Sequence, residues 1–207
     1  MPRATRTLLL ACLFVCAFSA AAAEKSILVF GDSLSAAYGL ARSRGWVALL
    51  EERLKRERLD YSVVNASVSG ETTAGGRARI DEALARHKPA VMVLELGGND
   101  GLRGLPVAQM KANLGAIIER SRKSGARVLL LGVRMPPNYG PDYTADFQHA
   151  FAELARRYHI ALVPNMLQDL GESRELFQPD GIHPSAEAQP AMLERIWPAL
   201  RPLLKQP

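Results

Sequence analysis

The feature that most constrains the fold is an alternation of short apolar segments with longer segments of helical period. Five short segments are nearly continuous in apolar residues: 26–30, 61–65, 90–94, 127–131 and 160–163. Five longer segments carry apolar residues at helical spacing: 46–58, 74–86, 107–124, 145–158 and 185–204. Continuous apolar strands are typical of parallel sheets that are buried on both faces. We therefore predict an α/β fold in which a five-stranded parallel sheet carries helices on both faces.

The first 23 residues have the pattern of a secretory signal peptide. Two arginines precede an apolar run over 8–18 that is short for a membrane span, and three alanines follow this run. We predict cleavage after Ala23, one mature domain over 24–207, and a periplasmic or secreted location. A lipid anchor on Cys12 is the alternative, but it leaves an apolar region of only about five residues, short of the roughly seven that export needs.

Charge and hydropathy exclude two classes of partner. The chain carries a formal net charge of +5, but its basic residues alternate with acidic ones, as over 51–58. Such a pattern is typical of a solvated helix face and not of a nucleic-acid surface. No later segment is long and apolar enough to span a bilayer. We expect no nucleic-acid partner and no stable membrane insertion, and we also expect a monomer.

Polar motifs follow the predicted strands. Gly-Asp-Ser-Leu-Ser at 31–35 comes after the first strand, Ala-Ser-Val-Ser-Gly at 66–70 after the second, and Gly-Gly-Asn-Asp at 97–100 after the third. A further motif, Asp-Gly-Ile-His-Pro at 180–184, precedes the last helix. In open parallel sheets, functional groups gather beyond the carboxyl ends of the strands. The motifs are therefore expected to meet at one edge of the sheet.

Ser33, Asp180 and His183 are the candidates for a catalytic triad. A serine hydroxyl is a weak nucleophile until a base takes its proton, and a third group must orient that base. His183 can serve as the base. Asp180 lies three residues earlier in a turn opened by Asp-Gly, so one short loop can present both side chains.

Three N–H donors are candidates for an oxyanion hole, which must be aimed at the charge that develops on the substrate oxygen. They are the backbone N–H groups of Ser33 and Gly70 and the side-chain amide of Asn99. Gly70 has no side chain that could obstruct a ligand. The carboxylates of Asp32 and Asp100 are expected to hold loops through hydrogen bonds rather than to react.

Together these motifs resemble those of the SGNH (GDSL) hydrolases. Ser33, Gly70, Asn99 and His183 occupy the four positions after which the family is named. The resemblance covers essentially all of 24–207. It implies a flavodoxin-like three-layer α/β/α sandwich, a shallow exposed substrate groove, and neither a metal nor a cofactor.

Three segments, 95–104, 137–140 and 180–184, are further similar to bacterial periplasmic multifunctional members of the family. Those members are described as acyl-CoA thioesterases, arylesterases and lysophospholipases. The resemblance implies that a loop over 101–106 borders the acyl chain and that a second segment forms the opposite wall. The residues expected to bind substrate in this way are Leu102, Leu105, Met135, Pro136 and Tyr139.

We therefore expect a serine hydrolase that cleaves ester and thioester bonds of small acyl esters, thioesters or lysophospholipids through a covalent acyl-serine intermediate. A carbohydrate O-deacetylase on the same fold is an alternative, because fold and triad do not fix the acyl group. A metal-dependent phosphoesterase is a weaker alternative, since two-metal sites need several converging ligands. A binding module without catalysis lacks support, because no glycine-rich phosphate loop follows the first strand.

Overall fold

A computed structural model describes residues 25–171 and 173–205. Its five strands form one sheet: β1 (Lys25–Gly31), β2 (Tyr61–Asn65), β3 (Val91–Glu95), β4 (Arg127–Leu131) and β5 (Ala161–Val163). All neighbouring strands are parallel, in the order β2-β1-β3-β4-β5. This is the strand order of flavodoxin-like doubly wound sheets, so the predicted fold class is confirmed.

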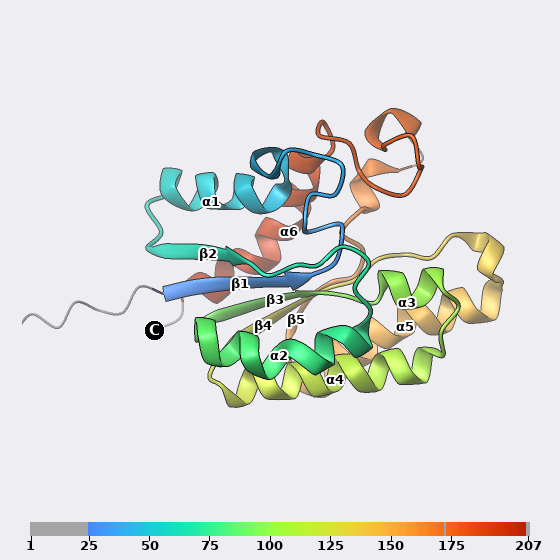
Figure 1. Cartoon of the computed structure of the whole chain (residues 1–207), viewed down its shortest axis with the longest axis horizontal. Coiled ribbons are helices and arrows are strands. Elements are labelled where there is room, and N and C mark those ends of the chain that lie inside the picture. Colours follow the sequence, from blue (N-terminus) through green and yellow to red (C-terminus); the bar gives the residue numbers. More distant parts are fainter. Residues whose placement is uncertain (1–24, 172, 206–207) are drawn as a thin grey trace, which may run out of the picture.

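The helices cover the sheet in two layers (Figure 1). On one face lie α1 (Trp46–Arg56) and α6 (Gln189–Leu204), which pack against each other. The other face carries α2 (Thr73–His87), α4 (Val107–Lys123) and α5 (Pro141–Tyr158), with α4 in contact with both of its neighbours. The molecule is therefore a three-layer α/β/α sandwich.

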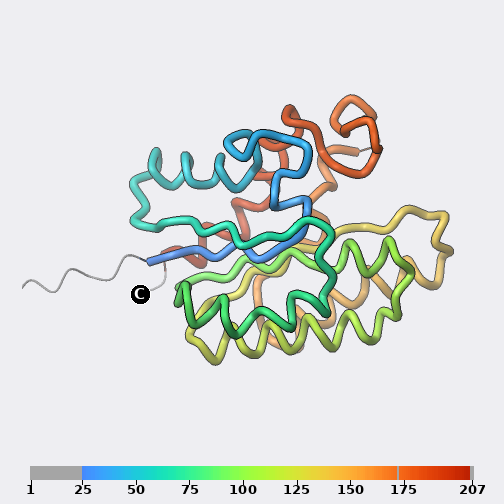
Figure 2. The backbone as a smooth tube through the Cα atoms, in the orientation of Figure 1, coloured from blue at the N-terminus to red at the C-terminus, as the bar shows by residue number. Residues whose placement is uncertain are grey.

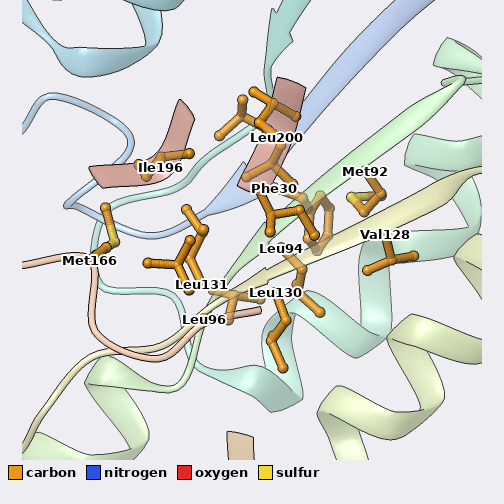
Figure 3. Packing of buried hydrophobic residues seen from close by; sticks show 14 of the residues in the cluster. Phe30, Met92, Leu94, Leu96, Val128, Leu130, Leu131, Met166, Ile196 and Leu200 are labelled. Carbon is orange, nitrogen blue, oxygen red and sulfur yellow. The ribbon is translucent and has the colours of Figure 1, made fainter. Parts of the chain in front are cut away.

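The core is built where the central strands meet both helix layers. The side chains of Phe30, Leu94 and Leu130 are fully buried in the sheet, and Ile196 and Leu200 of α6 belong to the same hydrophobic cluster (Figure 3). Burial of one such side chain contributes about 1.5–3 kcal/mol to the free energy of unfolding. Both cysteines of the chain lie before residue 25, so no disulfide supplements this core within the described residues.

Some element boundaries differ from the predictions. Helix α5 begins at Pro141 instead of 145, because a proline fits the first turn of a helix, where its missing N–H is not needed. Helix α6 begins at Gln189, four residues later than predicted, and it continues through Pro198 and Pro202. A short helix, α3 (Gly98–Leu102), replaces part of the loop expected after the third strand.

The predicted signal peptide and its cleavage site lie outside the described residues. Among the helices that the structure does describe, none is long and apolar enough to cross a membrane.

Candidate active site

Four segments far apart in the sequence meet at the carboxyl edge of the sheet (Figure 2). The Ser33 loop (residues 32–40) follows β1, the Gly70 loop (66–72) follows β2, and α3 follows β3. The His183 loop (177–188) precedes α6. Because parallel strands end at the same edge, these segments bring their polar side chains together.

The three residues predicted as a triad form one hydrogen-bonded chain. His183 Nε2 lies 2.8 Å from Ser33 Oγ, and His183 Nδ1 lies 2.7 Å from Asp180 Oδ2. The two ring nitrogens therefore face different partners. When Nδ1 carries the proton that binds the carboxylate, Nε2 is free to accept the proton of the serine hydroxyl.

The Asp180 side chain also organises the loop that carries His183. Its Oδ1 accepts hydrogen bonds from the backbone N–H groups of Ile182 (2.9 Å) and His183 (3.0 Å). Gly181 supports this turn with a φ of 68°, in the left-handed region that favours glycine. The backbone N–H of His183 is the main cause that lowers the pKa of Asp180 to about 2, so the carboxylate is charged at neutral pH.

Two residues that sequence reasoning did not select connect the His183 loop to the Ser33 loop. Gln178 Nε2 donates to the backbone carbonyls of Tyr38 (2.8 Å) and Pro184 (3.2 Å). The Tyr38 ring lies over His183, with 4.5 Å between the ring centroids. Gly39 leaves room for the Gln178 side chain, since a Cβ atom at position 39 would lie 2.1 Å from Gln178 Oε1. No local sequence pattern marks such contacts between distant segments.

The predicted oxyanion donors belong to three segments at the carboxyl edge of the sheet. Within the described residues, the backbone N–H groups of Ser33 and Gly70 donate no hydrogen bond to the protein. Gly70 is exposed, has a φ of 79°, and leaves the space at its missing Cβ empty. Arg103 Nη2 donates to the Gly70 carbonyl (3.0 Å), which braces this loop from the end of α3. Two of the three predicted donors are thus left unused by the described part of the protein.

The Asn99 amide is held in place by Asp32. Asn99 Nδ2 donates to Asp32 Oδ2 (3.0 Å), and the backbone N–H of Leu34 donates to Asp32 Oδ1 (3.1 Å). One proton of the Asn99 amide remains available, because an amide nitrogen carries two. Asp32 is only 2% exposed, and burial is the main cause that raises its pKa to about 6. The carboxylate therefore fixes a loop, as predicted.

Asp100, which follows Asn99 in α3, holds backbone in place as Asp32 does. Its Oδ2 accepts a hydrogen bond from the backbone N–H of Thr73 (2.8 Å), and its Oδ1 accepts one from the Thr73 hydroxyl (2.5 Å). These bonds fix the start of α2 against α3.

No group of three or more His, Cys, Asp or Glu side chains within the described part of the chain is arranged to hold a metal ion.

The residues predicted to bind an acyl chain come from two segments that face each other beyond β3 and β4. The hydroxyl groups of Tyr139 and Tyr143 donate to the carbonyls of Leu102 and Leu105, respectively, each over 2.9 Å. Met135 lies against Gly101, whose missing Cβ would be 2.3 Å from the Met135 sulfur. Leu102 and Leu105 are exposed, as is Pro136. One expectation is corrected: Leu102 lies at the end of α3 and not in a loop, because the Gly-Gly-Asn-Asp motif itself starts a helical turn.

Comparison with known proteins gives this arrangement a context. The family model of GDSL-like lipases and acylhydrolases matches residues 29–190. Esterase TesA of Pseudomonas aeruginosa is 52% identical over 96% of this chain and 100% of its own length. Thioesterase 1/protease 1/lysophospholipase L1 of Escherichia coli is 38% identical over 93% of this chain and 90% of its own length.

Solved structures agree with the sequence relatives. A crystal structure of TesA has a TM-score of 0.85 and 52% identity, and the match covers 86% of this chain and 99% of that one. The psychrotrophic esterase EstA of a Pseudoalteromonas species, inhibited by monoethylphosphonate, has a TM-score of 0.83 and 37% identity over 88% of this chain and 100% of that one. Fold, motifs and relatives agree: the chain belongs to the family of GDSL-like lipases and acylhydrolases and is a carboxylic ester hydrolase.

Proposed function

We propose that Ser33 is the nucleophile and His183 the general base. Asp180 orients the base and stabilises its protonated form. The observation that carries this proposal is the 2.8 Å separation between His183 Nε2 and Ser33 Oγ. It lies within the reach that a general base needs to remove a proton. The Asp180 carboxylate on Nδ1 stabilises the imidazolium that forms when the proton moves.

The reaction then proceeds in two halves, which are the acylation of Ser33 and the hydrolysis of the acyl-serine. Ser33 Oγ forms a bond to the acyl carbon as its proton passes to His183 Nε2, and the carbonyl oxygen becomes an oxyanion. The oxyanion collapses, and the bond to the alcohol or thiol breaks as that group takes the proton from His183. Water then attacks the acyl carbon as His183 takes one of its protons, and His183 returns this proton to Ser33 Oγ as the acyl–oxygen bond breaks and the acid leaves.

The oxyanion is stabilised by the N–H groups of Ser33 and Gly70 and by the free proton of the Asn99 amide. Two observations support these roles: both backbone groups are unused by the described protein, and Asp32 holds the amide. Donors fixed before the reaction need no reorganisation as charge develops, so each has a large effect on the rate. The removal of one such donor typically costs about a hundred- to a thousandfold in kcat.

We infer that the substrates are esters, thioesters or lysophospholipids with an apolar acyl chain. Support comes from the distribution of large apolar side chains that are exposed within the described residues: Tyr38, Val68, Leu102, Leu105 and Ile182. All belong to segments at the carboxyl edge of the sheet, where Ser33 lies. Exposed apolar patches often mark ligand or lipid sites, and we infer one at this edge of the sheet. Leu102 and Leu105 border the acyl chain on one side, and Met135, Pro136 and Tyr139 on the other.

The same proposal includes export of the chain, with removal of residues 1–23 and action as a monomer in the periplasm or outside the cell. The names of the relatives fit the substrate classes above, since they include an esterase and a thioesterase with lysophospholipase activity. A phosphoesterase is disfavoured by geometry, because His183 is engaged with Ser33 and Asp100 with Thr73.

Covalent labelling tests the proposal. A serine-directed alkylphosphonate should inactivate the enzyme and add its mass to the peptide that contains Ser33. The variant Ser173→Ala, which removes an exposed hydroxyl of another loop, should be labelled like the wild type. Activity should be unchanged by a metal chelator. Labelling at another residue, or a loss of activity on chelation, would contradict the serine mechanism.

A further inference from the structure

Glu95 is a buried acidic residue that the catalytic steps above do not use. It is the last residue of β3, follows four apolar residues of that strand, and is only 1% exposed. In the sheet it pairs with Gly31, the last residue of β1. The carboxyl group therefore lies directly beneath the start of the Ser33 loop.

The Ser33 loop is folded around this carboxyl group. Glu95 Oε2 accepts hydrogen bonds from the backbone N–H of Asp32 (3.2 Å) and from the hydroxyl of Ser35 (2.8 Å). The two donors flank the segment that carries Ser33. Gly31 permits the close approach, because a Cβ atom there would lie 2.6 Å from Glu95 Oε2. The position of the proposed nucleophile thus depends on one buried side chain.

Glu95 and Asp32 form a pair of acids without a basic partner. The backbone N–H of Asp32 donates to Glu95 Oε2 (3.2 Å), and burial together with the nearby charge of Asp32 raises the pKa of Glu95. The Ser35 hydroxyl is the other side chain that faces Glu95, and His183 faces Asp32 from the opposite loop. Among the residues that the structure describes, no Lys or Arg forms an ion pair with either acid. Two adjacent carboxyl groups in a buried site cannot readily both ionise, so they retain a proton between them.

We propose that Glu95 is a positioning residue that holds the Ser33 loop as a neutral carboxylic acid and donates a hydrogen bond to Asp32, which remains the charged member of the pair. The charge on Asp32 then serves two groups of the site. It accepts the hydrogen bond that aims the Asn99 amide, and it faces the imidazolium that His183 becomes. Glu95 thereby acts on the reaction through Asp32 and the Ser33 loop without touching substrate.

An activity comparison tests the positioning role. It is the one test of this inference that depends on the proposed function. The variants are Glu95→Gln, Glu95→Ala and, as a control, Glu52→Gln on the exposed face of α1, each assayed with p-nitrophenyl butyrate. Glutamine can accept both hydrogen bonds through its oxygen and donate to Asp32 through its amide. Glu95→Gln should therefore keep at least about a third of the wild-type kcat, since no required hydrogen bond is lost.

Glu95→Ala leaves two buried donors without an acceptor and frees the loop to shift. A displacement of about 1 Å can cost about a hundredfold in rate, so kcat should fall about a hundredfold while KM stays within about threefold. Glu52→Gln should behave like the wild type. Wild-type kcat in Glu95→Ala, or equal losses in the alanine and glutamine variants, would overturn the positioning role.

Thermal unfolding tests the protonation state independently of any activity. Burial is the main cause, followed by the charge of Asp32, that raises the pKa of Glu95 well above its ordinary value of 4.5. The folded protein then holds a proton that the unfolded chain releases above about pH 4.5, so the wild type loses stability as the pH rises toward the folded-state pKa. Glutamine has no such proton. The Tm of Glu95→Gln minus that of the wild type should therefore grow between about pH 5 and about pH 8, whereas the difference for Glu52→Gln should stay constant.

A difference for Glu95→Gln that stays constant over this range, or that falls, would show an ionised Glu95 and overturn the proposal. Infrared absorption of the wild type covers the case in which the variants fold poorly. Near neutral pH the spectrum should contain the C=O stretch of a protonated carboxyl group, and its absence would have the same consequence. If labelling at Ser33 fails while these two measurements succeed, the proposed function is wrong and the neutral acid stands.

Discussion

His183 Nε2 and Ser33 Oγ lie 2.8 Å apart although 150 positions separate the two residues in the chain. Neither residue belongs to a helix or strand, so no regular backbone element sets this distance. It depends on contacts between the two loops. Gln178 supplies the central one, because its side chain joins the backbone of Tyr38 to that of Pro184.

Replacement of Gln178 should therefore impair the chemical step more than substrate binding. In Gln178→Ala the two loops lose their shared donor, so we expect kcat to fall about tenfold or more and KM to change less than about threefold. Gln168→Ala, which removes an exposed glutamine from the segment before the loop, is the matched control and should retain wild-type kinetics. Steady-state kinetics with p-nitrophenyl butyrate decide the question. An unchanged kcat in Gln178→Ala would mean that other contacts fix the loops.

The Asn99 amide should contribute to the transition state and little to the bound substrate. Asn99→Ala removes the donor that Asp32 holds toward the site, and kcat should fall about a hundred- to a thousandfold with a nearly constant KM. A rise in KM at constant kcat would instead assign Asn99 to ground-state binding. Thermal unfolding of the variant checks that the loss does not come from a damaged fold.

The raised pKa of Asp32 predicts opposite effects of acid on activity and on stability. Below about pH 6 this carboxylate takes up a proton and no longer holds Asn99 or faces the imidazolium as a charge, so activity should fall. Its contribution to stability has the reverse sign: it is fully present below the ordinary value of 3.8 and is lost as the pH rises through about 6.

The profile of kcat/KM against pH measures the first of these effects. Protonation of His183 also stops the reaction, so the wild type should show an acid limb to which both groups contribute. Asp32→Asn should be slower at every pH, and its acid limb should be shallower because one of the two groups is gone. An acid limb of equal slope in both enzymes would show that protonation of Asp32 does not contribute to the loss of activity.

Much of the fold and the site could be predicted because both depend on local patterns. The apolar runs marked each strand to within two residues, and the motifs at their ends marked the edge where Ser33, His183 and Asp180 now lie together. A parallel sheet brings strand ends to one edge whatever the loops contain. The proximity of these residues therefore followed from the sequence, while their catalytic roles stay predictions.

The contacts that support the site could not be predicted in the same way. Glu95 ends the third strand, and its partners Asp32 and Ser35 lie 63 and 60 positions away in the sequence. Gln178 and Tyr38 are likewise joined only by the fold. One signal was present: an acidic residue that directly follows four apolar strand residues must be either solvated or paired, and Glu95 is only 1% exposed.

The most direct test of the central claim is the kcat/KM of Ser33→Ala with p-nitrophenyl butyrate, measured beside the wild type on folded protein of equal Tm. Removal of a hydroxyl that forms the acyl bond should lower kcat/KM by at least about a thousandfold and abolish the phosphonate adduct. Activity within about tenfold of the wild type would contradict the account, because another group would then have to attack the acyl carbon.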